Sequence, residues 1–388
     1  MKTLIYFFEK YISPSGGPSG YLYNLKKRRD ELSDDEIVFL NEKDFDSKLS
    51  YKVMHKMHSL GAQRKELSDH AAWIEEVLYQ SEKKGPFDLS GFDVIHFHSI
   101  IDMYSQKKNL EGFKGKVLLT SHTPKMPYRE YIEDTLNHDE YLKHKDLFDR
   151  VEEFAEYSFR NADYLVFPCK YAEEPYYHTW DAYPEIRNEK KILYLPTGVP
   201  KISVRRSREE IRKELNIPED RFVISFVGRH ISVKGYDRLV SLFGKLSNVT
   251  ALCCGREGAV KHPDSADWIE IGWTDDPFSY VNASDLFFLP NRETYFDLSL
   301  LETMSFGKCS LISLTGGNKS FAGREDCGIY TFGTDEQALE LVRSIMETEP
   351  EKIRAEEAAQ VQLYEEEYTV ARFYDRYKDM LRKIDHAT

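Results

Sequence analysis

The chain has 388 residues, of which 41% are hydrophobic and 13% aromatic, and its formal net charge is −13 at pH 7. This length exceeds what one hydrophobic core usually supports, so we expect two domains, and the apolar content excludes long disordered regions. The acidic balance excludes a protein whose main task is to grip a nucleic-acid backbone, because that task requires a basic surface. An anionic ligand would have to be held by a local cluster of cations.

The five cysteines show no C-x-x-C pair and no zinc-like spacing. We therefore expect reduced thiols in a cytosolic protein. The first residues, MKTLIYFFEKY, lack the long apolar core of a signal peptide, and an apolar run of about 18 residues occurs nowhere. These features predict a soluble, cytoplasmic chain, which could touch the inner face of a membrane only through a surface patch.

The first 200 residues alternate strand-like apolar runs with helical patterns. The runs cover residues 4–8, 36–40, 93–97, 116–120, 161–170 and 193–200. Such alternation predicts a parallel sheet that collects ligand-binding groups at the carboxyl ends of its strands. Residues 128–160 read as a densely charged helical insertion with a solvated outer face.

A glycine loop, SPSGGPSG, follows the first strand and contains Gly16 and Gly17. Glycine can adopt positive φ and lets a ligand approach the backbone, although an ordinary turn would use the same residues. The loop is not G-x-G-x-x-G, so a nicotinamide dinucleotide site is not indicated.

Histidines follow two of these strands. His122 lies at the carboxyl end of the fourth run, a position compatible with either a structural or a catalytic role. His96 and His98 form an H-x-H pattern; without a third ligand at recognisable spacing, it favours a half-buried strand face over a metal site.

A second doubly wound domain is predicted from about residue 201. Ser207 and Glu210 form a capping box before its first helix, and strand-like runs cover residues 222–227, 249–253, 268–271, 285–289, 309–313 and 328–331. The loop GRHISVKG after the first run carries Arg229 and Lys234. A guanidinium fork and an ammonium on one loop can neutralise a diphosphate, and the alternative is two solvated surface cations.

The stretch FFLPNRETYFDLSLLETMSFG, residues 287–307, reads as a strand, a loop and the start of a helix. The N–H groups at a helix start suit a phosphate or a sugar hydroxyl. The alternative is purely structural, because Ser299 and Glu302 could form a capping box.

This stretch resembles the donor-binding signature of family 4 glycosyltransferases, which are retaining enzymes of the GT-B fold. The matching residues are Pro290, Phe296, Leu298, Leu301, Glu302, Met304 and Gly307. Two residues depart from the pattern: Thr294 stands where the first glutamate belongs, one residue after Glu293, and Asp297 stands where the family usually has glycine. The loop with Arg229 and Lys234 resembles the family motif G-R-x(4)-K-G, and Gly316 and Gly317 lie where the family often has a Gly-Gly pair near the donor.

The resemblance implies an α/β GT-B architecture of two Rossmann-like domains that face each other across a cleft. Residues 1–200 would form the acceptor-side domain, residues 201–365 the nucleotide-sugar-binding domain, and residues 366–388 a helix that crosses back to the first domain. The implied function is retaining transfer of a sugar, from a UDP-sugar donor by family breadth, to a hydroxyl acceptor in the synthesis of a cell-surface glycan or glycoconjugate. No metal or other cofactor is expected, since Asp275 and Asp276 read as a helix start and not as a D-x-D motif.

The resemblance also assigns roles to residues. His122 would lie next to the transferred sugar, Arg229 and Lys234 would stabilise the departing diphosphate, and Glu302 would hold the ribose hydroxyls. The remaining candidate donor-binding residues are Gly16, Gly17, Glu293, Thr294, Phe296, Asp297 and Leu298.

Three other functions stay open at this point. Thr294 and Asp297 are compatible with a non-catalytic partner subunit that binds a nucleotide sugar for another transferase. An epimerase, or a phosphorylase with a lysine-bound pyridoxal cofactor, could use the same fold.

Residues 51–70 contain the cations Lys52, Lys56, Arg64 and Lys65. These cations read as a solvated helix face or, in a GT-B enzyme, as a contact with a membrane or a lipid-linked acceptor.

Overall fold

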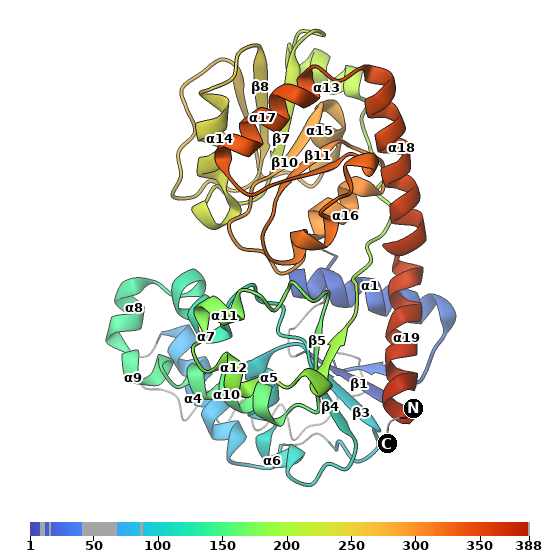
Figure 1. Cartoon of the computed structure of the whole chain (residues 1–388). Coiled ribbons are helices and arrows are strands. Elements are labelled where there is room, and N and C mark those ends of the chain that lie inside the picture. Colours follow the sequence, from blue (N-terminus) through green and yellow to red (C-terminus); the bar gives the residue numbers. More distant parts are fainter. Residues whose placement is uncertain (8–11, 15–16, 41–67, 86–87, 387–388) are drawn as a thin grey trace. The chain divides into compact units, whose positions relative to one another are not determined.

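The computed structural model describes residues 1–7, 12–14, 17–40, 68–85 and 88–386 (Figure 1). Gly16 and the four cations within residues 51–70, which the sequence analysis singled out, lie outside these ranges. The chain divides into two compact units. Unit 1 consists of Met1–Pro168, Glu173–Pro196 and Tyr374–Thr388, and unit 2 consists of Cys169–Ala172 and Thr197–Phe373.

Unit 1 is built on a six-stranded sheet with the order β2-β1-β3-β4-β5-β6, in which all neighbouring strands are parallel. The strands are β1 (Thr3–Tyr6), β2 (Ile37–Phe39), β3 (Val94–Phe97), β4 (Lys116–Leu119), β5 (Tyr164–Phe167) and β6 (Ile192–Tyr194). Each lies within or overlaps one predicted run. The central strands β1 and β3 are buried along their whole length, as expected for a parallel sheet covered on both faces.

Helices of 4 to 16 residues connect the strands of unit 1. They include α1 (Gly17–Leu32), α4 (Asp69–Ser81), α5 (Ile100–Ser105), α6 (Lys107–Leu110), α11 (Tyr176–Thr179) and α12 (Tyr183–Ile186). The predicted insertion at 128–160 is helical but broken into α7 (Pro127–Glu130), a π-helical turn (Tyr131–Thr135), α8 (His138–Lys143), α9 (Lys145–Phe148) and α10 (Val151–Asn161). It is less solvated than its charge suggests, because Phe148, Val151 and Phe154 are fully buried.

Unit 2 contains a second parallel six-stranded sheet, with the order β12-β11-β10-β7-β8-β9. Its strands are β7 (Phe222–Val227), β8 (Val249–Cys254), β9 (Trp268–Gly272), β10 (Leu286–Leu289), β11 (Ser310–Ser313) and β12 (Ile329–Phe332). All six predicted runs are therefore confirmed as strands. The strand order reverses between β7 and β10, and ligands of such sheets bind at the carboxyl ends of the strands around this reversal.

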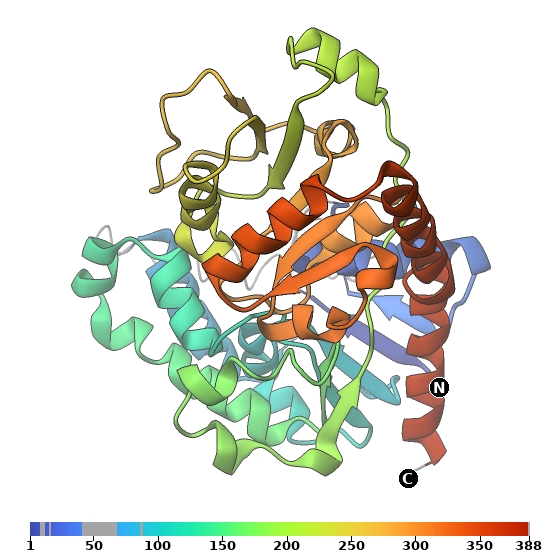
Figure 2. The same ribbon diagram turned by 45° about the horizontal axis from the view of Figure 1, so that its top comes forward.

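Helices cover both faces of this sheet. They are α13 (Arg208–Glu214), α14 (Tyr236–Phe243), α15 (Pro277–Ala283), α16 (Leu298–Met304), α17 (Asp335–Met346) and α18 (Pro350–Glu367). Figure 2 shows α17 lying across one face. Along β10, Leu286 and Phe288 join one buried cluster while Phe287 and Leu289 join another, so the strand contributes to a core on each face. The predicted capping box of Ser207 and Glu210 is present at α13.

The last helix, α19 (Val370–His386), follows a break in the helical path after α18. Its predicted apolar stripe of Phe373, Tyr374, Tyr377 and Leu381 is buried. From Tyr374 onward the helix belongs to unit 1, where the Tyr374 hydroxyl donates to Asp34 Oδ2 at 2.7 Å. Lys378 Nζ lies 2.8 Å from the same oxygen and 2.6 Å from Glu36 Oε2.

All five cysteines are free thiols, and four of them are buried. Within the described ranges, every helix is too short or too polar to cross a lipid bilayer.

The anchoring of α19 gives a test of these contacts. Burial opposes ionisation of Asp34, but hydrogen bonds from Lys378 and Tyr374 outweigh it and lower the pKa of this carboxyl below its usual value. A hydrogen bond to a charged group contributes roughly 1.5–3 kcal/mol, so Tyr374→Phe should lower the melting temperature by several degrees at pH 7. Because the folded pKa is depressed, this contribution is present above the unfolded pKa of about 4 and is lost as the pH falls further.

Tyr364→Phe is the matched control. The Tyr364 hydroxyl donates to the neutral Val199 carbonyl at 2.9 Å, so its effect on the melting temperature should not change between pH 7 and pH 3. An equal pH dependence of the two variants would show that Asp34 is not the partner that matters.

Candidate functional site

Three loops meet at the carboxyl ends of β7, β10 and β11 in unit 2. We name them the first loop (228–235), the middle loop (290–297) and the third loop (314–318). The Arg292 amide of the middle loop donates to the Val233 carbonyl of the first loop at 2.9 Å. On the other side, the Gly317 amide of the third loop donates to the Thr294 carbonyl at 3.3 Å. The middle loop is therefore held between the other two by its backbone.

Glycines allow this close approach. Gly235 has φ +70, and a Cβ there would lie 2.0 Å from the Pro290 carbonyl oxygen. Gly316 has φ +45, and its Cβ would lie 1.9 Å from the Thr294 carbonyl oxygen. Both positions combine a left-handed backbone with a contact that no larger residue can make. The two outer loops can pack against the middle loop only because these residues are glycine.

Lys234 lies at the end of the first loop, with its Nζ 3.9 Å from Asp297 Oδ1 of the middle loop. The other oxygen of Asp297 accepts a hydrogen bond of 2.6 Å from the buried Asn291 amide. Asp297 also occupies the N-cap position of α16, but its side chain caps no backbone amide. The structure thus brings one of the predicted cations together with the carboxylate that replaces the family glycine.

The structural alternative for residues 287–307 is wrong. A capping box of Ser299 and Glu302 would require Ser299 to precede the helix, whereas α16 begins at Leu298. The reason is that the chain turns into the helix two residues earlier, at Asp297, whose φ of −81 and ψ of 106 are those of an N-cap. Glu302 therefore lies inside the helix.

The Glu302 side chain is half-buried and forms no ion pair with the described residues. Burial raises its pKa to about 7. Near neutral pH it therefore exists in both protonation states. Hydroxyl donors from a ligand would favour the ionised form and supply the hydrogen bonds that water otherwise provides.

The remaining predicted residues of unit 2 differ in their surroundings. Arg229 is exposed and pairs with no carboxylate of the described chain. At the first-glutamate position, Thr294 is buried, and Glu293 is partly buried with its Oε2 lacking a hydrogen-bond partner among the described residues. Phe296 and Leu298 are partly buried and pack against a core cluster.

In unit 1, His122 follows β4 with φ +58, an uncommon conformation for a non-glycine residue. Such backbone strain concentrates at functional sites. Its Nε2 lies 2.8 Å from Nδ1 of His98, and its ring meets Tyr21 edge-on at 4.9 Å. The expectation that His96 and His98 form a half-buried strand face is wrong, because both are almost fully buried. The His96 ring stacks on Tyr377 of α19, and the His98 ring packs against Tyr21 of α1.

Two further predicted features can be placed. Gly17 is the first residue of α1, and its neighbour Gly16 lies outside the described residues. Asp275 and Asp276 precede α15, as predicted for a helix start, and pair with Arg205 at 2.9 Å and Arg206 at 3.3 Å. In the part of the chain that the structure describes, no group of three or more His, Cys, Asp or Glu side chains is arranged so that it could hold a metal ion.

The sequence analysis did not identify three residues that position the candidate site residues. Asn291 orients Asp297, Gly235 allows the first loop to reach the middle loop, and His98 contacts His122. Only His98 had a local signal, the H-x-H pattern. Gly235 acts through a contact with Pro290, far along the sequence, and Asn291 acts within the middle loop, through a side-chain hydrogen bond that has no sequence pattern of its own.

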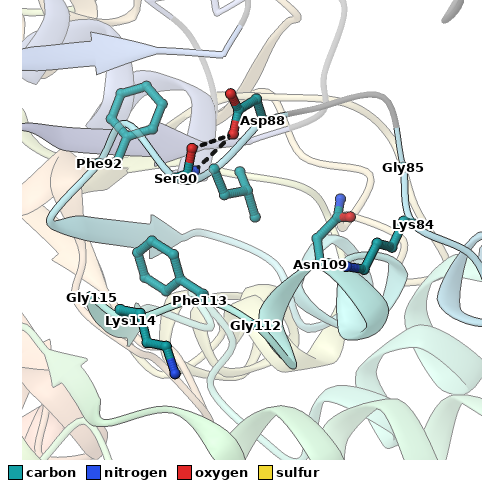
Figure 3. A pocket seen from close by; sticks show the side chains of 11 residues that line it. Lys84, Gly85, Asp88, Ser90, Phe92, Asn109, Gly112, Phe113, Lys114 and Gly115 are labelled. Atoms are coloured by element: carbon teal, nitrogen blue, oxygen red, sulfur yellow. Dashed lines mark hydrogen bonds between the residues drawn. The ribbon is translucent and has the colours of Figure 1, made fainter.

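A cavity of about 340 Å³ lies in unit 1 at the amino ends of β3 and β4, the opposite end of β4 from His122. In the view of Figure 3, Phe92 and Phe113 lie on one side of it, and Asn109 and Lys84 on the other. It contains none of the predicted site residues.

Residues 207–362 match the family model described as glycosyl transferases group 1. The match includes all three loops and confirms the predicted enzyme class, a glycosyltransferase. No curated protein sequence matches the chain.

Solved structures resemble the whole chain. Sucrose-phosphate synthase from Thermosynechococcus elongatus superposes with a TM-score of 0.64 at 14% identity, covering 100% of this chain and 99% of its own. HepE from Anabaena, crystallised in complex with UDP-glucose, gives 0.63 at 14% identity, covering 99% and 100%. WaaG, a glycosyltransferase involved in lipopolysaccharide biosynthesis, gives 0.58 at 14% identity, covering 98% and 99%. These likenesses confirm the predicted GT-B fold with two Rossmann-like domains.

The contact of Gly235 with Pro290 predicts how a methyl group added at position 235 would change the stability of the protein. Gly235→Ala should destabilise the protein by roughly 1–3 kcal/mol, because alanine at φ +70 is strained and its Cβ has no space. Thermal unfolding measures this change. Gly244→Ala is the control, since Gly244 has φ −62 and its Cβ would meet no atom closer than 3.8 Å. That variant should be neutral or more stable by about 0.4–1 kcal/mol, and equal losses in both variants would contradict the steric explanation.

The raised pKa of Glu302 predicts a pH-dependent stability. Between the unfolded pKa of about 4.3 and the folded pKa of about 7, the native state binds more protons than the unfolded state, so stability falls as the pH rises. Glu302→Gln removes this loss. Its melting temperature relative to the unmodified protein should therefore be higher at pH 8 than at pH 5. A pH-independent difference would show that the carboxyl group is not buried in the folded protein.

Proposed function

We propose that the chain transfers a sugar from a nucleotide-sugar donor, a UDP-sugar, to a hydroxyl group of an acceptor, with retention at the anomeric carbon, as a family 4 enzyme. The observation that carries the proposal is the convergence of three loops in unit 2 with Lys234, Asp297 and the neighbouring helix of Glu302. This convergence lies at the strand-order reversal of a glycosyl transferases group 1 domain. The complex of the structurally similar HepE with UDP-glucose supports this donor class.

The reaction places its largest charge change on the departing diphosphate. The bond from the anomeric carbon to the phosphate oxygen breaks, the acceptor oxygen bonds to that carbon, and the hydroxyl proton passes to the departing phosphate. Fixed cations stabilise this developing negative charge more strongly than they stabilise the ground state. We assign this role to Arg229 and Lys234, which lie on one loop and have no stronger anionic partner among the described residues than Asp297 at 3.9 Å.

Glu302 is assigned to the ribose of the donor. A carboxylate can accept hydrogen bonds from two neighbouring hydroxyls, and these would compensate for the burial that raises its pKa. Glu293 and Thr294 are assigned to a hydroxyl of the transferred sugar, and the backbone of Phe296, Asp297 and Leu298 to its phosphate or sugar oxygens. In unit 1, Gly16 and Gly17 are assigned to the donor phosphates and His122 to a sugar oxygen. The reaction requires neither a metal nor another cofactor.

The acceptor is proposed to be a glycan, lipid-linked or protein-linked hydroxyl in the synthesis of a cell-surface polysaccharide or glycoconjugate. The reaction is assigned to the cytoplasm, at the inner face of the membrane when the acceptor is lipid-linked. These assignments follow the resemblance of the two motifs to family 4 enzymes.

The alternative function is a non-catalytic nucleotide-sugar-binding partner of another transferase. Two observations favour it: Asp297 places a carboxylate beside Lys234, and Thr294 replaces a glutamate. Saturable binding of a UDP-sugar without transfer or hydrolysis would support this alternative over the enzyme.

Removing either cation tests the proposal. Arg229→Ala or Lys234→Ala should lower turnover of the donor by roughly 10²-fold or more, as expected for loss of a group that stabilises developing charge. The donor is first identified by thermal shift with UDP, GDP, ADP and their sugars, and turnover is then measured as release of the nucleoside diphosphate.

Lys213→Ala is the control, because Lys213 is an exposed cation on α13, which precedes the amino end of β7. Its turnover should equal that of the unmodified protein. Unchanged kinetics in both loop variants would remove the proposed diphosphate site.

A further inference from the structure

Three histidines gather at the carboxyl ends of β3 and β4 in unit 1. His96 lies on β3, His98 follows this strand directly, and His122 follows β4. The rings of His96 and His98 are 4.1 Å apart, and those of His98 and His122 are 5.1 Å apart. The proposed function uses only His122. The other two are buried polar groups that need their own explanation.

His96 has its hydrogen bonds satisfied by hydroxyl groups. Its Nε2 lies 2.8 Å from Thr120 Oγ1 and its Nδ1 lies 3.1 Å from Tyr377 Oη. A hydroxyl group can donate or accept, so both tautomers of His96 are accommodated. His96 therefore reads as a satisfied core residue of unit 1.

His98 is different. Its Nδ1 lies 2.8 Å from Nε2 of His122, but its own Nε2 is buried and has no hydrogen-bond partner among the described residues. Burial lowers the pKa of both His98 and His122, and no carboxylate opposes this effect. Both rings are therefore neutral, and only one of the two facing nitrogens carries a proton.

The two possible arrangements differ in what they bury. If His122 donated from Nε2, His98 would hold its proton on its own Nε2, which leaves a buried N–H without an acceptor. If His98 donates from Nδ1, its Nε2 is left only as an unpaired acceptor. Orphaned buried N–H groups are rarer in proteins than acceptors with an unused lone pair, so the second arrangement is favoured.

We propose that His98 is a positioning residue that donates from Nδ1 to His122 Nε2 and thereby fixes His122 in the tautomer protonated on Nδ1. The sugar-facing role of His122 rests on the proposed function; the tautomer does not. Fixed in this way, His122 carries its proton on Nδ1 and has no basic nitrogen outside the hydrogen bond with His98. It can hold a sugar oxygen, but it cannot accept the proton of the acceptor hydroxyl. That proton is left to the departing phosphate.

The tautomer can be measured without donor, acceptor or turnover. The full chain is labelled with ¹⁵N-histidine, and imidazole nitrogens are observed by NMR at pH 7, with the His122 signals assigned by their loss in His122→Asn. We expect the proton of His122 on Nδ1 and that of His98 on Nδ1 as well. A proton on Nε2 of His122 would overturn the inference even if the chain proves to be an active transferase.

Variants of His98 add a functional readout. His98→Asn keeps an N–H donor near the place of Nδ1 and should retain the His122 tautomer and turnover within about threefold. His98→Phe keeps the bulk but removes the donor, so His122 should lose its single tautomer and turnover should fall roughly tenfold, the value of one hydrogen bond. Failure of Asn to restore what Phe loses would contradict a positioning role.

His96→Phe is the matched structural control. It removes a histidine of equal burial that does not contact a nitrogen of His122, so it should lower the melting temperature and leave the His122 tautomer unchanged. If His96→Phe alters the His122 signals as much as His98→Phe does, packing and not the hydrogen bond sets the tautomer.

The two proposals can fail separately. If the protein lacks transferase activity while His122 carries its proton on Nδ1, the proposed function fails and the inference about His98 stands.

Discussion

The candidate site of unit 2 depends on a steric constraint between backbones. The Pro290 and Thr294 carbonyls lie where the Cβ atoms of Gly235 and Gly316 would be, and the middle loop is fixed by these contacts from both sides. With that loop fixed, Asn291 can hold Asp297 and the chain can enter α16 at Leu298. The position of Glu302, one turn further along, follows from the same entry point. Gly235, Gly316 and Asn291 are not assigned to a ligand, yet they position Asp297 and Glu302, which are.

The candidate site residues of the two units differ in charge. In unit 2 the site combines two cations with carboxylates, one of which lies 3.9 Å from Lys234. In unit 1, His96 and His98 are buried and His122 is half-buried, and desolvation lowers the pKa of all three, that of His96 to about 3. In a chain with a net charge of −13, the proposed diphosphate site depends on two cations that lie on one short loop. The histidines then contribute through geometry and hydrogen bonding, not through charge.

The fold was predictable because its signals are local. Runs such as 222–227 are rich in β-branched and aromatic residues, and β7 occupies the same residues as the predicted run. The two S-x-x-E patterns show where local signals fail. Ser207 and Glu210 form their capping box, whereas Ser299 and Glu302 do not, because Asn291 holds Asp297 in the position from which the helix starts. The hydrogen bond of His98 joins residues 24 positions apart and requires strand pairing that no local pattern encodes.

The division of unit 1 into separate stretches of sequence has a consequence for the order of synthesis. Its final segment, Tyr374–Thr388, supplies the partners of Asp34, Glu36 and His96. A ribosome adds about 5–20 residues per second and completes N-terminal domains first when they can fold alone. Here the first unit to begin is the last to be completed, because all of unit 2 is translated before Tyr374–Thr388. Until that segment has been made, Asp34, Glu36 and the buried His96 of the nascent chain lack these partners.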